Sequence, residues 1–125
     1  MTKAALLLAT LLISQNTLAV TMQWSPCQTI TSVADYRAYD GAVYLAISPG
    51  IPGSPGIPGC IYGGVNRVRM VNGTLGMTAD TLKGGIAIGL TAMATKVPVQ
   101  FYYDASVITC DVQVVAVGGN SGTCQ

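Results

Sequence analysis

The sequence predicts a mainly β domain with one helix, an α+β arrangement, on three observations. Runs of β-branched and aromatic residues end at glycine, asparagine or aspartate turn signals. One stretch, 78–96, has apolar residues at helical spacing instead. Four cysteines in a chain of 125 residues indicate covalent cross-links. Five predicted strands with the helix between the third and the fourth is the order of an OB-fold, a five-stranded Greek-key barrel.

Turn residues delimit the strands. Asp40-Gly41 separates the first two strands and is typical of a type I′ hairpin, because both central residues of that turn need positive φ. Gly63-Gly64 predicts a bulge or sharp bend in the third strand. Pro98 lies near the start of the fourth, where a missing donor is tolerated. The predicted strands are 29–39, 42–47, 60–71, 97–103 and 111–117.

The helix has N-cap oxygens at 78–80 and two unusual faces. Its apolar stripe predicts the side that packs on the domain: Leu82, Ile86, Leu90 and Met93. The other side is small or apolar where a surface helix should be polar, and each glycine costs up to about 1 kcal/mol. We therefore predict an oligomer face there, with a helix buried on both sides of one monomer as the alternative. Its residues are Gly85, Ile88, Gly89 and Ala92.

A Gly/Pro-rich loop, 48–59, contains the repeat GIPGSPGIPG. A collagen helix needs glycine at every third position over many triplets, and three triplets are too few. The prolines fix their own φ and extend the preceding residues. We expect a stiff loop that serves as a spacer or as a displayed rim.

The N-terminus predicts export. Lys3, an apolar run at 4–13 and small residues before Ala19 are typical of a signal peptide, residues 1–19, with cleavage near Ala19. The run is too short to span a membrane, and no later stretch is long enough. The mature part, residues 20–125, has the size of one domain, secreted or periplasmic. Its even number of cysteines implies two disulfides rather than a zinc site, since no CxxC pair or histidine is present.

The composition argues against several functions. Without histidine or glutamate, the commonest general bases are missing, so we expect no enzyme and no cofactor. Asp104 and Ser106 lie close together but lack a base that would complete a catalytic set, and a strand-connecting turn is the simpler interpretation. The mature part carries five basic and five acidic residues, which predicts no nucleic-acid partner. Low charge also favours a homo-oligomer. Arg67 and Arg69 share one face of a strand, where they meet an anion or solvent.

One segment resembles a known family. GMTADTLKGGIAIGLTAMATKVPVQFYYD, followed by a cysteine and a final apolar strand, resembles the helix and fourth strand of the B subunits of bacterial AB5 toxins, of the subtilase-cytotoxin and typhoid-toxin type. Small exported proteins of Gram-negative bacteria share a similar pattern. The resemblance implies a pentameric ring, outer faces that bind sialylated glycans, and a catalytic A-type partner. The Gly/Pro-rich loop is foreign to this pattern, and no sugar-contacting residue is carried over.

The implied barrel also predicts the disulfides. Its third and fifth strands lie side by side and parallel, so Cys60 and Cys110, which head them, meet at one end. Cys27 then pairs with Cys124, although Cys110–Cys124 is an alternative. For ligand contacts, aromatic residues supply flat apolar faces with polar tips, although tyrosine is also common in strands. The candidate glycan or partner contacts are Trp24, Tyr36, Tyr39, Tyr62, Tyr102 and Tyr103, and Tyr44 has the same chemistry.

The leading hypothesis is therefore an exported, non-catalytic glycan-binding subunit that forms a ring. The alternative is a structural or protein-interaction protein of the bacterial envelope with no glycan site.

Overall fold

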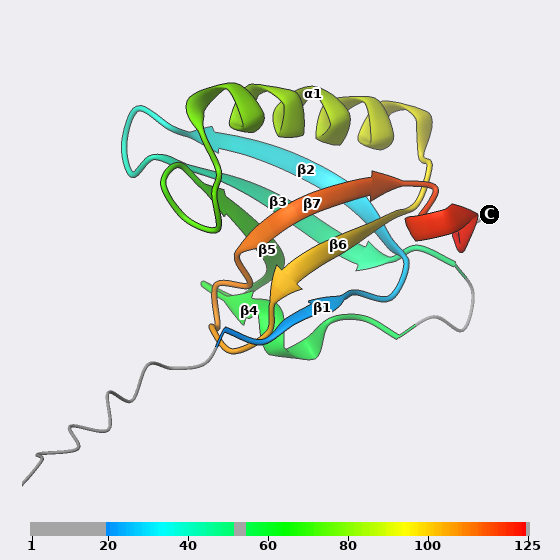
Figure 1. Cartoon of the computed structure of the whole chain (residues 1–125). Helices are drawn as coiled ribbons and strands as arrows, with labels where there is room; N and C mark the ends of the chain where they lie inside the picture. Colours follow the sequence, from blue (N-terminus) through cyan, green and yellow to red (C-terminus); the bar gives the residue numbers. More distant parts are fainter. Residues whose placement is uncertain (1–19, 52–54, 125) are drawn as a thin grey trace, which may run out of the picture.

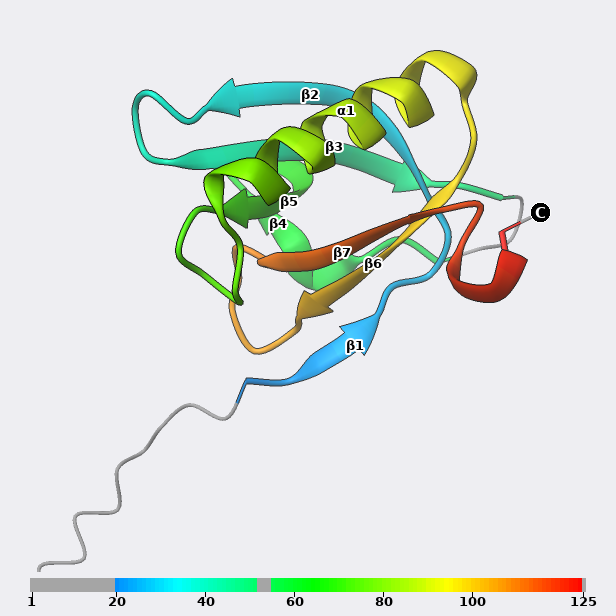
Figure 2. The same ribbon diagram turned by 45° about the horizontal axis from the view of Figure 1, so that its top comes forward.

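The computed structural model describes residues 20–51 and 55–124 and shows a curled antiparallel sheet with one α-helix lying over it (Figure 1, Figure 2). The predicted mainly β class with one helix is confirmed. The predicted signal peptide, 1–19, lies outside the described residues. No helix in the described ranges is long and apolar enough to span a membrane. The elements are β1 (Met22–Trp24), β2 (Gln28–Tyr36), β3 (Ala42–Pro49), the 3-10 turn η1 (Pro58–Cys60), β4 (Ile61–Tyr62), β5 (Val65–Val71), α1 (Ala79–Thr95), β6 (Val99–Asp104), β7 (Val112–Val117) and the 3-10 turn η2 (Asn120–Gly122).

The sheet has seven strands rather than five. The N-terminal strand begins earlier than predicted and runs as β1 and β2, with a break at 25–27. The predicted strand 60–71 folds back on itself as β4 and β5, because Gly63 and Gly64 take φ of +62° and +75° and form a turn, which is the sharp bend of the two predicted alternatives. The helix therefore lies between the fifth and sixth strands instead of between the third and fourth.

The β2–β3 hairpin has the predicted antiparallel pairing but a longer turn. Tyr36 pairs with Ala42, so residues 37–41 connect the strands, and among these Gly41 has positive φ. The type I′ prediction is wrong because Asp40 does not take positive φ and five residues, not two, connect the strands. The side chain of Asp40 helps to close this longer turn. Its carboxylate accepts hydrogen bonds from Ala42 N at 2.9 Å and from the Tyr44 hydroxyl at 2.6 Å.

The sheet curls because β6 pairs with both parts of the N-terminal strand. β6 lies antiparallel to β1 and meets β2 at Gln28↔Val99. Beyond that pair, β2 continues beside β3, which pairs with β5. On the far side, β5 meets Asp111, the residue just before β7, in a parallel bridge, Arg69↔Asp111. α1 packs on β2 and β7, across the space between the two halves of the curl (Figure 2).

Strand alternation separates a core face from an outer face. Val43, Leu45 and Ile47 of β3 point into the curl and are buried, whereas Tyr44 and Ala46 between them point outward. The inward residues meet a second set from β5, β6 and α1. Burying a side chain of this size contributes about 1.5–3 kcal/mol. The largest fully buried apolar side chains are Phe101, Ile30, Leu45, Met70 and Leu82.

Helix α1 begins at a capping box but is rotated from the predicted orientation. Thr78 N donates to the Thr81 hydroxyl, and Thr81 N donates to that of Thr78. The helix ends at Lys96, which takes φ of +56°. Leu82 is buried as predicted, but Leu90 is 45% exposed, so its place in the inward stripe is wrong.

Glycines cause this rotation because they let α1 approach its own sheet. A Cβ at Gly89 would lie 3.3 Å from Leu45 Cδ2, and one at Gly85 would lie 2.7 Å from Met70 Sδ. Gly89 and Ala92 are buried inside the domain, so the predicted oligomer face is wrong for these two residues. Gly85 is half-buried against Met70, and Ile88 is exposed, so for these two the oligomer face stays a prediction.

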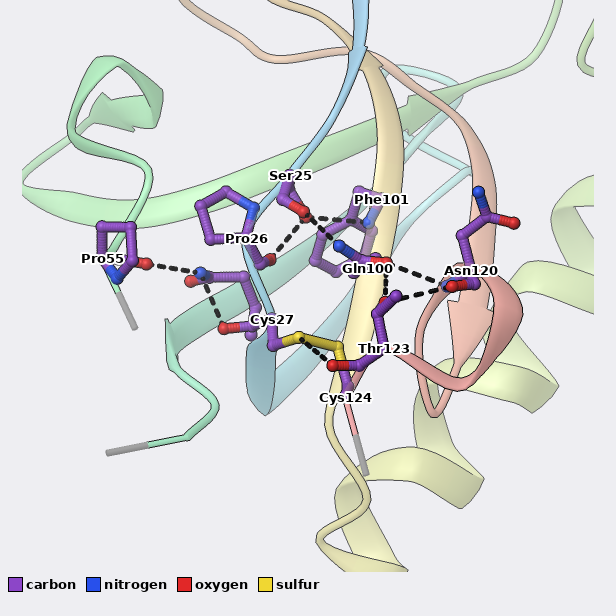
Figure 3. The surroundings of a disulfide bond; sticks show 10 residues. Ser25, Pro26, Cys27, Pro55, Gln100, Phe101, Asn120, Thr123 and Cys124 are labelled. Carbon is purple, nitrogen blue, oxygen red and sulfur yellow. Dashed lines mark hydrogen bonds between the residues drawn. A yellow bond between two sulfur atoms is a disulfide. The ribbon is translucent and has the colours of Figure 1, made fainter. Parts of the chain in front are cut away.

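Two disulfides join distant parts of the chain. Cys27–Cys124 spans 97 residues and ties the start of β2 to the C-terminal turn (Figure 3). Cys60–Cys110 spans 50 residues and joins the segment before β4 to the segment before β7. This is the pairing predicted from the barrel, and the Cys110–Cys124 alternative is wrong. Two disulfides fit an extracellular or periplasmic protein, because they persist in oxidising compartments.

The described parts of the Gly/Pro-rich loop are anchored to the domain. Gly50 N donates to Cys27 O at 2.8 Å, and a Cβ at Gly50 would lie 2.8 Å from the Gln28 carbonyl carbon. The buried Gln28 side chain donates from Nε2 to Pro55 O at 3.1 Å. Ile57 is buried in the core. These contacts show a segment that packs on the sheet, which a spacer would not do.

Candidate functional site

An arginine lies over two adjacent tyrosine rings, whose centroids are 5.9 Å apart, on the outer face of β3, β4 and β5. The Arg67 guanidinium carbon is 4.0 Å from the ring centroid of Tyr62 and 5.0 Å from that of Tyr44. Both distances are within the cation–π range. Tyr36 adds an edge contact to Tyr44, with ring centroids 5.5 Å apart. We call these four residues, Tyr36, Tyr44, Tyr62 and Arg67, the tyrosine–arginine cluster.

Two local features bring the cluster together. Val68 of β5 is buried in the core, so its neighbour Arg67, which pairs with Ala46, points to the outer face and reaches diagonally over Tyr44 of β3. The tight β4–β5 turn carries Tyr62 back over the same face. A Cβ at Gly63 would lie 2.7 Å from a terminal guanidinium nitrogen of Arg67. The absence of a side chain at Gly63 therefore provides the space that the Arg67 guanidinium occupies.

Arg67 and its neighbour Arg69 differ in their charge partners. Asp111 accepts from Arg69 Nε at 2.8 Å and from a terminal nitrogen at 3.1 Å, and this two-point ion pair raises the pKa of Arg69. Within residues 20–51 and 55–124, the ion pairs are this one and Arg37–Asp35. The positive charge of Arg67 is therefore balanced by the faces of two rings and by no described carboxylate.

The hydroxyls of Tyr44 and Tyr62 stay protonated at neutral pH, because the pKa of each is raised. The Tyr44 hydroxyl donates to Asp40, and this hydrogen bond raises the pKa of Tyr44 and lowers that of Asp40. Burial raises the pKa of Tyr62 to about 12. The Tyr62 hydroxyl and Arg67 Nε are shielded from solvent without a hydrogen-bond partner in the described part of the chain. Such groups cost about 1–3 kcal/mol each, which a ligand that reached them would partly recover.

The structure divides the predicted aromatic contacts between two places. Tyr36 and Tyr62 belong to the cluster. Trp24 and Tyr102 form a separate pair on β1 and β6, with ring centroids 5.2 Å apart and Trp24 37% exposed. The six candidates therefore do not form one site.

The remaining two candidates lie elsewhere, and two members of the cluster were outside the list of six candidates. Tyr39 is 88% exposed at the β2–β3 turn. Tyr103 is 4% exposed and its hydroxyl accepts from Gln23 Nε2, so its assignment as a ligand contact is wrong. Tyr44 was noted for the same chemistry and Arg67 as an anion or solvent contact, but neither was listed among the six candidates. The sequence signal for both is the alternation of outward and inward residues on 42–47 and 65–71.

Asp104 and Ser106 form a turn at the end of β6. The Ser106 hydroxyl and backbone N both donate to the Asp104 carboxylate, at 2.5 and 2.9 Å. Thr21 N donates to the same oxygen at 3.1 Å. This carboxylate is engaged in closing the turn and in holding the N-terminal strand, as the simpler interpretation of this segment predicted.

No group of three or more histidine, cysteine, aspartate or glutamate side chains in the described ranges is placed to hold a metal ion. Comparisons of the chain with protein-family profiles, with curated proteins and with solved structures find no match. The geometry of the tyrosine–arginine cluster is therefore the basis for a functional proposal.

Proposed function

We propose that this chain is an exported, non-catalytic glycan-binding protein and that the tyrosine–arginine cluster is its sugar site. The single observation that carries the proposal is the Arg67 guanidinium, which lies over the adjacent rings of Tyr44 and Tyr62 and has no carboxylate partner in the described part of the chain. Aromatic rings offer an apolar surface for the C–H faces of a sugar, and the tyrosine hydroxyls offer polar tips beside it.

The chemistry of the cluster favours an acidic sugar. A guanidinium presents donors in a planar fork that matches a carboxylate in two-point geometry, and stacking on aromatic rings leaves its edge available for such a contact. The sialylated glycans that the family resemblance implied carry such a carboxylate. Neutral glycans would use the rings alone and should bind more weakly.

The strand order supports the same face. An OB-type barrel has five strands. Here the first would be β1 with β2, the second β3, the third β4 with β5, the fourth β6 and the fifth β7. The parallel bridge Arg69↔Asp111 then joins the third strand to the residue just before the fifth. OB-folds bind oligosaccharides and oligonucleotides on the outer face of the second and third strands. In this chain that face is the one that carries Tyr44 and Arg67.

A glycan array on the mature protein, with acidic and neutral sugars, tests the proposal. We expect the acidic set to bind and Arg67→Gln to weaken that binding at least ten-fold. Lys83→Gln removes the same charge from the exposed surface of α1 and should leave binding unchanged. Equal binding by both variants, or no binding to any glycan at high protein concentration, would contradict the proposal.

A protein-interaction role in the bacterial envelope is the second candidate, and exposed aliphatic side chains favour it. Ile88 and Leu90 of α1 and Val114 and Val117 of β7 are between 38% and 47% exposed. A homo-oligomer, its pentameric form and a catalytic A-type partner stay predictions. Sedimentation velocity tests the oligomer directly, and a monodisperse monomer would contradict it.

A further inference from the structure

An open groove runs between the first half of β7 and the first half of α1, apart from the tyrosine–arginine cluster. Its volume is about 510 Å³. Met70 and Met77 line it from the core side, Gly84 and Ile88 from the helix, and Val114 from the strand. No charged side chain lines it. A pocket of this size and composition is typical of sites that take apolar groups.

The wall of the groove formed by β7 is a strand edge. β7 pairs with β6 on one side, and on its other side the described residues provide one bridge, Arg69↔Asp111, just before the strand begins. Edge strands expose rows of N–H and C=O groups that another strand can pair with, and proteins usually protect them with charged residues or proline. Val112–Val117, VQVVAV, contains neither.

The opposite wall contains a glycine that packing within the chain does not explain. Gly85 and Gly89 allow α1 to approach the sheet, but a Cβ at Gly84 would meet no atom within 4 Å. Glycine in a helix costs up to about 1 kcal/mol relative to alanine. The effect of Gly84 is that no side chain extends from the helix into the groove at this position.

We propose that β7 adds an extended, uncharged apolar segment of a partner protein as a further strand, with its side chains in this groove. Pairing with the free edge requires an extended backbone, and the uncharged lining selects uncharged side chains. The bare flank at Gly84 leaves room for that backbone. A second copy of this chain fits less well, because its own β7 has α1 beside its free edge and the two helices would meet before the strands paired.

A labelled synthetic peptide, three valine–threonine repeats with a lysine at each end, tests the proposal by fluorescence anisotropy on the mature protein. We expect saturable binding, and at least ten-fold weaker binding by the same peptide with proline in place of the central valine, because proline cannot donate to the strand edge. Hydrogen exchange should show slower exchange of β7 amides with the first peptide. No binding at millimolar concentration, or equal binding of the two peptides, would overturn the proposal.

Two variants locate the binding. Gly84→Leu fills the groove from its bare wall and should weaken peptide binding at least ten-fold without a lower unfolding temperature, because the added side chain meets open space. Ala87→Leu makes the matched change at an exposed helix position that does not line the groove and should bind normally. Unchanged binding by Gly84→Leu would overturn the proposal. So would a wild-type dimer that Gly84→Leu dissociates, since a second copy would then occupy the groove.

Discussion

Arg67 is held by stacking and by the absence of a side chain at its neighbour Gly63. The guanidinium lies over two rings, and a terminal nitrogen occupies the space next to the turn where a Cβ would otherwise be. A surface arginine normally keeps many rotamers, and ordering it costs conformational entropy when a ligand binds. An arginine that is already ordered by two rings avoids part of that cost.

A substitution at the turn should therefore affect Arg67 specifically. Gly63→Ala places a methyl group 2.7 Å from the guanidinium and should displace it, which weakens glycan binding and shifts the Arg67 Nε–H resonance in NMR spectra. Gly64→Ala is the matched control, since it also has positive φ but meets no atom within 4 Å. Both should lose about 1–2 kcal/mol of stability from the strained φ. Equal effects on the Arg67 resonance would contradict the stacked arrangement.

Carboxylates set the pH dependence of stability. Burial raises the pKa of the Asp104 carboxyl, but hydrogen bonds from Ser106 and Thr21 outweigh this, so its folded pKa lies below the ordinary value for aspartate. A lowered pKa adds stability that is complete above the unfolded pKa, about 3.9, and is lost as pH falls through the folded pKa. Hydrogen bonds likewise lower the pKa of Asp40 in its turn.

We therefore expect a level stability profile from about pH 5 to pH 8, where histidine would titrate and this chain has none, and a loss of stability below about pH 4. Urea denaturation across this range measures it. Asp104→Asn should flatten part of the acid limb. A stability change of more than about 1 kcal/mol between pH 5 and pH 8 would contradict this account.

At the scale of elements, α1 combines glycines that serve two different purposes. Gly89 is buried against Leu45 and Val33, where the helix comes closest to the sheet, whereas Gly84 faces the open groove. Glycine lowers the intrinsic helix propensity at both positions, and the structural effect differs between them. Gly89 allows close packing of the helix on the sheet, and Gly84 leaves the groove open.

Substitutions at the two glycines should have opposite effects on stability. Gly84→Ala should stabilise the fold by about 0.5–1 kcal/mol, because alanine forms helix better and meets no other atom. Gly89→Leu should destabilise it by about 1–3 kcal/mol through overpacking against Leu45. Thermal and urea denaturation measure both. A stabilising Gly89→Leu would mean that the helix does not contact the sheet at this point.

At the scale of the whole molecule, the two disulfides join segments that lie outside the strands of the sheet. Cys27–Cys124 fastens a C-terminal turn that is otherwise held by Gln100, which accepts from Asn120 N and the Thr123 hydroxyl (Figure 3). Cys60–Cys110 fastens the segments that precede Tyr62 and Asp111. The second bond therefore supports the candidate site as well as the fold.

Removing either disulfide should destabilise the protein by about 2–4 kcal/mol, since both close long loops in the unfolded chain. Paired alanine substitutions at Cys27 and Cys124, or at Cys60 and Cys110, test each bond separately by denaturation under non-reducing conditions. We expect the Cys60 and Cys110 pair to lose glycan binding more than the other pair at equal stability loss. Equal loss of glycan binding by the two paired variants would contradict a role of Cys60–Cys110 in supporting the candidate site.

The candidate site was partly predictable. The alternation on 65–71 places Arg67 on an outer face, and Tyr36 and Tyr62 were identified as contacts. Their meeting with Tyr44 depends on the turn at Gly63 and Gly64, which folds one predicted strand into two. A double glycine is compatible with a bulge or a tight turn, and the sequence alone left both open.

The local chemistry of the sequence determined the element types, the helix limits near Thr78 and Lys96, and an even set of cysteines that must pair, because these depend on neighbouring residues. Tertiary structure alone decided which side of α1 faces the core. Apolar size favoured a stripe through Leu90, but the closest approach of two backbones is possible where side chains are absent, so Gly89 turned inward and Leu90 outward. Contacts between residues distant in the chain set that choice.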